Sequence, residues 1–161
     1  MYMPLRNTCA RMMATQVFPD DTPLEANENR SEVYAIAYRH QLAPGTDSAG
    51  TVRAISAETG ATVWLHEQRA ATMSLVATGG GLVFGGDVNG RFKAFDHQTG
   101  EVLWEINLGS AVTGFPITYA VDGRQYVAVS TGSGGTSAHF TGLTPELRPS
   151  AGNNLFVFGL P

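Results

Sequence analysis

The feature that most constrains the fold of this chain is an eleven-residue pattern that occurs twice, forty residues apart. The first copy, residues 54–64, reads Ala-Ile-Ser-Ala-Glu-Thr-Gly-Ala-Thr-Val-Trp, and the second, residues 94–104, reads Ala-Phe-Asp-His-Gln-Thr-Gly-Glu-Val-Leu-Trp. Ala, Thr, Gly and Trp recur at the same offsets in both copies. A period of about forty residues is typical of β-propeller blades, each of which is a small antiparallel sheet. The repeat therefore predicts an all-β chain made of stacked sheets.

Each copy of the pattern predicts two strands joined by a tight turn. Apolar and polar residues alternate before the turn, Thr-Gly supplies turn chemistry, and β-branched and aromatic residues follow it. The resulting hairpins bring Trp64 and Trp104 to equivalent positions. Because a Trp side chain buries about 150–250 Å², we expect the two indoles to hold neighbouring sheets together. Further strands are predicted at 72–78, 82–86, 91–96, 113–119 and 125–131, with turns at 87–90 and 122–123.

The pattern is weaker outside residues 51–131. Residues 1–5 predict a short strand, which we expect to pair with a segment upstream of the chain. Residues 12–50 are polar apart from one apolar island at 33–38, which predicts a long excursion with one short strand or helical turn. Residues 154–160 predict a final strand that pairs with an early blade and closes the ring. The domain prediction is therefore a blade remnant and irregular inter-blade excursion at 1–50, followed by propeller blades at 51–161.

Composition and isolated side chains exclude several kinds of site. The net charge is −4 and Lys93 is the only lysine, which argues against nucleic-acid binding. One cysteine and four dispersed histidines do not predict a metal cluster, and residues 1–15 do not form a signal-peptide pattern. The carboxylates interpreted as solvated or as capping turns are Glu58, Asp96, Glu101 and Glu105.

Residues 94–104 match in full the pattern Ala-x-Asp-x-x-Thr-Gly-x-x-x-Trp, which resembles the tryptophan-docking motif of PQQ-dependent (quinoprotein) alcohol dehydrogenases. The earlier copy has Ser56 where that motif has Asp. Segments 1–9, 75–87, 114–129 and 154–161 are also similar to this family, so the resemblance covers nearly the whole chain. It implies about three blades of an eight-bladed propeller. The open ends of such an arc expose apolar sheet faces, so we expect the isolated chain to associate or to be poorly soluble.

The resemblance implies a C-terminal fragment of an enzyme that oxidises a primary alcohol to an aldehyde and passes electrons to cytochrome c or a quinone. The parent enzyme would bind PQQ with Ca²⁺ or a lanthanide, lie in the periplasm, and include the remainder of the propeller as upstream polypeptide. The family's catalytic Asp and metal ligands have no counterpart here, so the chain is expected to be inactive alone and to bind no cofactor tightly. One alternative is a non-enzymatic PQQ-repeat propeller scaffold for protein–protein interaction, and another is a sugar dehydrogenase of the same superfamily.

The resemblance also implies cofactor-binding residues at three places. Asn7 lies at, or within one residue of, a family Asn that reaches the quinone. Gly135 and Thr136 lie in a loop where the family has Gly-Gly-Trp beside the cofactor, and Thr72 falls where methanol-oxidising members carry another Trp. The two threonines in place of Trp imply a different or larger substrate than methanol, whereas the alternative is that they are ordinary loop and strand residues.

Overall fold

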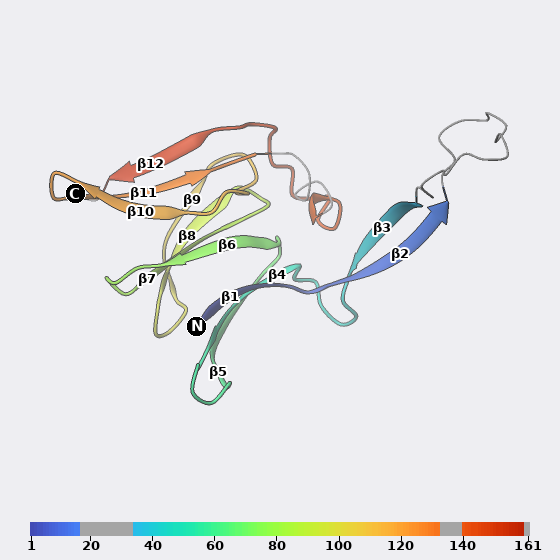
Figure 1. Cartoon of the computed structure of the whole chain (residues 1–161), viewed down its shortest axis with the longest axis horizontal. Coiled ribbons are helices and arrows are strands. Elements are labelled where there is room, and N and C mark those ends of the chain that lie inside the picture. The colour runs from blue at the N-terminus through green and yellow to red at the C-terminus, as the bar shows by residue number, and fades with distance from the viewer. Residues whose placement is uncertain (17–33, 133–139, 160–161) are drawn as a thin grey trace, which may run out of the picture.

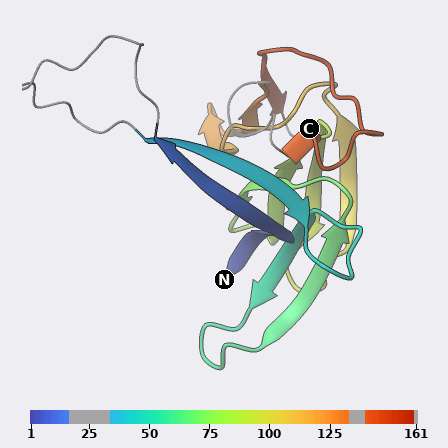
Figure 2. The same cartoon turned by 90° about the vertical axis from the view of Figure 1, so that its right-hand side faces the viewer.

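The structure is a computed structural model that describes the backbone of residues 1–16, 34–132 and 140–159, and side chains within 1–11, 40–132 and 140–159. Three antiparallel sheets lie side by side, and a separate hairpin extends away from them (Figures 1 and 2). The first sheet has the order β1(Tyr2–Arg6), β4(Gly50–Ile55), β5(Thr62–Gln68). The second sheet has the order β6(Thr72–Ala77), β7(Leu82–Asp87), β8(Arg91–Asp96), β9(Val102–Asn107). The third sheet has the order β10(Ile117–Val121), β11(Arg124–Ser130), β12(Leu155–Gly159), and the hairpin pairs β2(Thr8–Gln16) with β3(Tyr34–Leu42).

The two copies of the repeat form equivalent hairpins, as predicted. Ala54 lies opposite Trp64 in the β4–β5 pair, and Ala94 lies opposite Trp104 in the β8–β9 pair. The fold class expected from the sequence is therefore confirmed: the chain is all-β, with sheets that succeed one another along the sequence.

The turns of the two hairpins are closed by side chains at the same position of the repeat. One carboxylate oxygen of Asp96 accepts hydrogen bonds from the backbone N–H groups of Gln98 and Thr99, both at 2.8 Å. These bonds favour the ionised form and hold the pKa of Asp96 below its usual value. In the first copy the hydroxyl of Ser56 accepts the corresponding bond from the N–H of Thr59 at 3.2 Å. Ser56 thus performs the turn-capping role of the Asp that it replaces.

One expectation about the first fifty residues was wrong: the expected irregular excursion contains the β2–β3 hairpin, whose strands have nine residues each. β1 pairs with β4, downstream of it, and β12 pairs with β11 in its own sheet. Both are outermost strands of their sheets in the described part of the chain. The pairings of β1 with an upstream segment and of β12 with an early blade therefore stay predictions.

The core lies between the sheets, where apolar side chains from adjacent faces meet. The cluster between the first and second sheets consists of Val52, Ala54, Trp64, Val83 and Phe95. The cluster between the second and third sheets consists of Phe84, Phe92, Ala94, Val112, Val127 and Val129. A third cluster lies at one end of the sheets and consists of Ala49, Ala70, Ala71, Val88, Ala111 and Phe140.

Trp64 and Trp104 contact the following sheet in each case, but to different extents. The indole of Trp64 is 7% exposed, and its N–H donates to the carbonyl oxygen of His97 at 3.0 Å. The ring also covers Gly100, where a Cβ would lie 2.5 Å from it. Trp104 is 39% exposed and packs edge-on against Phe158, beside an apolar cavity of about 330 Å³. The first indole is therefore seated between two sheets, whereas the second covers its neighbour only in part.

Large apolar side chains are exposed at both ends of the stack. The third sheet exposes Ile117, Tyr119 and Val121 on β10 and Leu155 and Val157 on β12. At the other end, Val63 and Leu65 of β5 are exposed. No helix in the described part of the chain is long and apolar enough to cross a membrane.

Candidate functional site

Two of the residues predicted to contact a cofactor, Asn7 and Thr72, lie at the same end of the sheets, the edge formed where β1 ends and β6 begins. Asn7 directly follows β1, and Thr72 begins β6. Gly50, which pairs with Arg6 at the end of β1, connects them, because a Cβ on Gly50 would lie 2.7 Å from the backbone nitrogen of Thr72. Gly135 and Thr136 lie outside the described residues. Phe140, the first described residue after them, belongs to the core cluster at this edge.

The side chain of Asn7 ties the two ends of the β2–β3 excursion together. Its amide nitrogen donates to the carbonyl oxygen of Ser48 at 3.1 Å, and its amide oxygen accepts from the hydroxyl of Thr51 at 3.0 Å. Its backbone nitrogen and oxygen bond to Ala49 and Ala43. A primary amide has two N–H donors and two acceptor lone pairs. One donor and one lone pair therefore remain beyond these contacts.

The side chain of Thr72 is buried inside the junction between the first two sheets. It is 2% exposed, and its hydroxyl oxygen accepts a hydrogen bond from the amide nitrogen of Gln68 at 2.8 Å. Its strand partner in β7 is Asp87. The hydroxyl thus has a structural role between sheets, and its contact with a cofactor stays a prediction.

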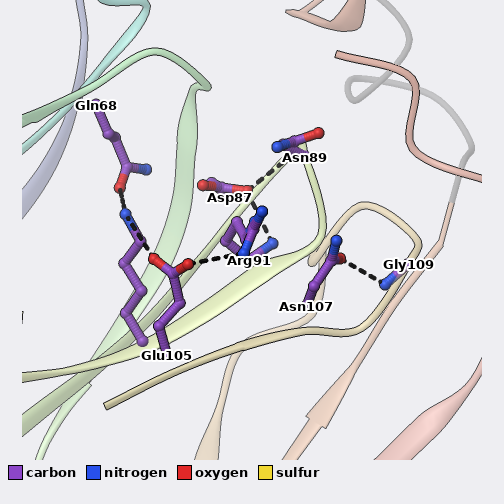
Figure 3. A network of polar contacts seen from close by, with 8 residues as sticks. Gln68, Asp87, Asn89, Arg91, Glu105, Asn107 and Gly109 are labelled. Carbon is purple, nitrogen blue, oxygen red and sulfur yellow. Dashed lines mark hydrogen bonds and ion pairs between the residues drawn. The ribbon is translucent and has the colours of Figure 1, made fainter. Parts of the chain in front are cut away.

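A polar network continues from Gln68 across the junction (Figure 3). The amide oxygen of Gln68 on β5 accepts from the ammonium of Lys93 on β8 at 3.0 Å. Lys93 lies 3.5 Å from one carboxylate oxygen of Glu105 on β9, and the other oxygen of Glu105 accepts from Arg91 at 2.8 Å. Lys93 is 9% exposed, so this pairing is what makes its burial tolerable. Glu105, interpreted from the sequence as solvated or turn-capping, is exposed and is also the anion of this network.

Asp87 is the most perturbed acid of the described residues. Burial raises its pKa to about 6, although hydrogen bonds from the backbone nitrogens of Arg91 and Asn89 favour its charged form. Perturbed carboxyl groups often mark functional sites. Both hydrogen bonds lie within its own β7–β8 turn, however, so its observed role is to close that turn. The sequence indicated the turn but not the burial, which depends on the neighbouring sheets.

Arg6 directly precedes Asn7, within one residue of the position expected for the family Asn, and it has a different environment. Its guanidinium carbon lies 4.3 Å from the centre of the Phe140 ring, and one of its nitrogens lies 3.9 Å from the sulfur of Met73. The exposed guanidinium of Arg6 and the spare amide donor of Asn7 are each hydrogen-bond donors of the kind that an oxygen-rich ligand accepts.

Arg69 fixes the segments that border this edge. Its guanidinium donates to a carboxylate oxygen of Glu146 at 2.6 Å, to the carbonyl oxygen of Asp47 at 2.6 Å and to that of Leu143 at 3.3 Å. Sequence reasoning missed it, because its partners lie in two segments, at Asp47 and at 143–146, that are distant from Arg69 in the sequence. Within the described residues, no group of three or more His, Cys, Asp or Glu side chains is placed to hold a metal ion.

Comparisons with known proteins agree with this architecture. Residues 32–127 match the family model for PQQ, the β-propeller domain of glucose/ethanol/alcohol dehydrogenases. The chain is 42% identical over 118 residues to the quinoprotein ethanol dehydrogenase of Pseudomonas putida, covering 71% of this chain and 19% of that protein. It is 42% identical over 106 residues to methanol dehydrogenase [cytochrome c] subunit 1 of Paracoccus denitrificans, covering 65% of this chain and 16% of that protein.

A solved structure of a europium-containing methanol dehydrogenase superposes on 99% of this chain and 30% of its own, with a TM-score of 0.77 and 28% identity. That of the quinohemoprotein alcohol dehydrogenase from Comamonas testosteroni superposes on 81% of this chain and 20% of its own, with a TM-score of 0.62 and 28% identity. The chain spans about a fifth of the length of the curated relatives that it matches. From the repeat, the sheets and these matches, we conclude that the chain belongs to the PQQ family of glucose, ethanol and alcohol dehydrogenase β-propeller domains.

Proposed function

We propose that the chain is the C-terminal segment of a PQQ-dependent alcohol dehydrogenase that oxidises a primary alcohol to an aldehyde and passes the electrons to cytochrome c or a quinone. The observation that carries the proposal is the family match over residues 32–127. It is supported by relatives named quinoprotein ethanol dehydrogenase, 1-butanol dehydrogenase (quinone) and methanol dehydrogenase [cytochrome c]. The proposed location is the periplasm.

The contribution of this chain would be structural and, at one edge, cofactor-binding. PQQ, when bound, supplies the quinone that accepts the electrons of the alcohol. The spare N–H of Asn7 suits a quinone carbonyl oxygen, so this residue fits the group. The catalytic Asp and the ligands for Ca²⁺ or a lanthanide would come from the rest of the propeller. By itself the chain is proposed to be inactive.

The first sheet supports the proposal that further sheets precede it in the complete protein. In the second sheet, the space beside Gly100 is filled by the ring of Trp64. At the equivalent Gly60 of the first sheet, no described atom lies within 4 Å of an added Cβ. The surface around Gly100 is covered by Trp64, whereas the equivalent surface around Gly60 is uncovered among the described residues. This is expected if a preceding blade covers the first sheet.

A complementation experiment tests this function. The purified chain is mixed with PQQ, Ca²⁺, ethanol and a dye acceptor, first alone and then with the part of the Pseudomonas putida ethanol dehydrogenase that precedes the matched segment. We expect no turnover from the chain alone and turnover from the mixture. Turnover by the chain alone would place catalytic residues within it and contradict the proposal.

The role of Asn7 is tested in the same mixture. Asn7→Ala should weaken PQQ binding about tenfold, because it removes one hydrogen bond to the cofactor and loosens the excursion that carries it. Gln98→Ala is the control, since Gln98 is exposed on the turn of another sheet. A mixture that assembles but never binds PQQ would favour a scaffold over an enzyme.

A further inference from the structure

The repeat places Arg53 of the first sheet at the position that Lys93 occupies in the second, forty residues later. Arg53 pairs with Leu65 in the β4–β5 hairpin, as Lys93 pairs with Glu105 in the β8–β9 hairpin. Because side chains alternate between the faces of a strand, Arg53 and Leu65 lie on the face opposite to Ala54 and Trp64. We call this the leading face of the first sheet.

The equivalent face of the second sheet is covered by the first sheet, and there Lys93 has two polar partners. A carboxylate oxygen of Glu105, on the same sheet, lies 3.5 Å from the ammonium nitrogen of Lys93. Lys93 also donates a hydrogen bond across the junction to Gln68 on the outer strand of the first sheet, at 3.0 Å. A neutral amide is sufficient as the partner across the junction, because the charge is compensated within the sheet.

Arg53 has neither kind of partner within the described part of the chain. Leu65 stands where Glu105 would supply the anion. The Nε–H group of Arg53 is buried and has no hydrogen-bond acceptor among the described residues. Val63 and Leu65, on the same face, are 61% and 45% exposed. A buried donor left unpaired is costly, and more so when it belongs to a charged group.

We propose that the leading face of the first sheet docks against a preceding sheet whose outermost strand presents a carboxylate to Arg53, at the position that Gln68 occupies opposite Lys93. Among the described residues, Leu65 stands at the position of Glu105, and Glu67, on the same face of β5, forms no ion pair with Arg53. The partner is therefore expected to supply a carboxylate and not an amide. The inference rests on the proposed function, in which that preceding sheet is the adjacent blade of the same propeller. It adds the chemistry by which the two blades recognise each other.

The first experiment uses the junction inside the chain as a copy of the absent one. The double variant K93R/E105L gives the second sheet the Arg–Leu pair of the first sheet, and Gln68→Glu then supplies the proposed carboxylate. In this background Gln68→Glu should raise the folding equilibrium constant about tenfold, as measured by urea unfolding. In the wild-type background it should give no gain, because Glu105 already neutralises Lys93. Gln98→Glu, on an exposed turn, is the matched control. Equal effects in the two backgrounds would overturn the proposal.

The second experiment measures docking directly. The probe is the part of the Pseudomonas putida ethanol dehydrogenase that precedes the matched segment, made with Glu, Gln or Leu at the outer-strand position that faces Arg53. The Glu form should bind the chain about tenfold more tightly than the other two. Arg53→Gln should remove this preference, whereas Arg148→Gln, on an exposed loop, should leave it intact.

The outcomes separate this inference from the proposed function. If the three forms bind equally, the carboxylate assignment is wrong while the propeller assignment stands. If none of them binds, the leading face is not a blade junction and both fall.

Discussion

Two glycines at the same position of the repeat give a matched test of how the sheets are held together. Gly60 and Gly100 both have positive φ, 72° and 74°. They differ in what surrounds them, since a Cβ on Gly100 would lie 2.5 Å from the ring of Trp64 and one on Gly60 would meet nothing within 4 Å. Replacing each by Ala therefore imposes the same backbone strain but displaces an indole only in one case.

The expected losses of folding free energy follow from these environments. An Ala in the left-handed region costs about 1–2 kcal/mol, which is the whole effect expected for Gly60→Ala. At Gly100 the ring of Trp64 must also move, which adds about 1–3 kcal/mol for overpacking. The hydrogen bond from the indole to His97 is then lost as well, for about 1 kcal/mol more. Gly100→Ala should thus cost about 2 kcal/mol or more beyond Gly60→Ala.

The assay is urea unfolding followed by tryptophan emission in a Trp104→Phe background, so that Trp64 is the only indole. Gly100→Ala should also shift the native emission of Trp64 to the red, because the ring becomes exposed, whereas Gly60→Ala should not. Equal losses of stability with unchanged emission in both variants would show that Trp64 does not seat the second sheet on the first.

Three further predictions concern charge, anchoring and association. Burial raises the pKa of Asp87 to about 6; because this folded-state value exceeds the unfolded one, stability is lost as pH rises from about 4 through 6. Asp87→Asn keeps an oxygen for the turn but carries no charge, so it should stabilise the chain by up to about 3 kcal/mol at pH 8 and little at pH 4 in urea unfolding. Arg69→Ala should cost about 1 kcal/mol and speed amide exchange in residues 140–150, because Glu146 and the nearby carbonyl lose their donor. Ile117→Lys should reduce self-association in sedimentation, because it charges the exposed apolar face of the third sheet.

Each of these predictions has its own control. For Asp87→Asn, a stability gain that is equal at both pH values would mean that the carboxyl is not desolvated. For Arg69→Ala, the control is Arg148→Ala at an exposed position, which should leave amide exchange unchanged. Equal amide protection of residues 140–150 in the two variants would show that the Arg69 contacts do not hold this segment. For association, a wild-type chain that sediments as a sharp monomer would contradict self-association through the apolar face of the third sheet.

The repeat hairpins could be predicted from the sequence because everything that makes them is local. Alternation set the strands, Thr-Gly set the turn, and the Asp96 carboxylate closes a turn formed by its own neighbours. Trp64 and Trp104 were placed correctly at equivalent positions. Asn7 and Thr72 were named by resemblance, and the fold brings them to one edge, while their contact with a cofactor stays a prediction.

The contacts of the site residues depended on the tertiary structure. The hydroxyl of Thr72 bonds to Gln68. Lys93 occupies a polar position of an alternating strand pattern, which is typical of an exposed residue, but it is buried. A strand residue is solvated or buried according to whether a second sheet covers its face, and its own sequence window is the same in both cases. Arg53 and Lys93 show this directly, because they share a position in the repeat and differ in what lies opposite.

The sequence by itself thus determined the kind of sheet, the position of its turns and the family to which it belongs. Only the tertiary structure decided that β1 joins β4, that β2 pairs with β3, and that β12 lies beside β11. These strands are separated by long intervening segments. The entropic cost of closing a loop rises only slowly with its length, so it does not select one distant partner over another. Which distant strand is chosen is therefore settled by the free edge and apolar face that each sheet offers, and these exist only once the sheets have formed.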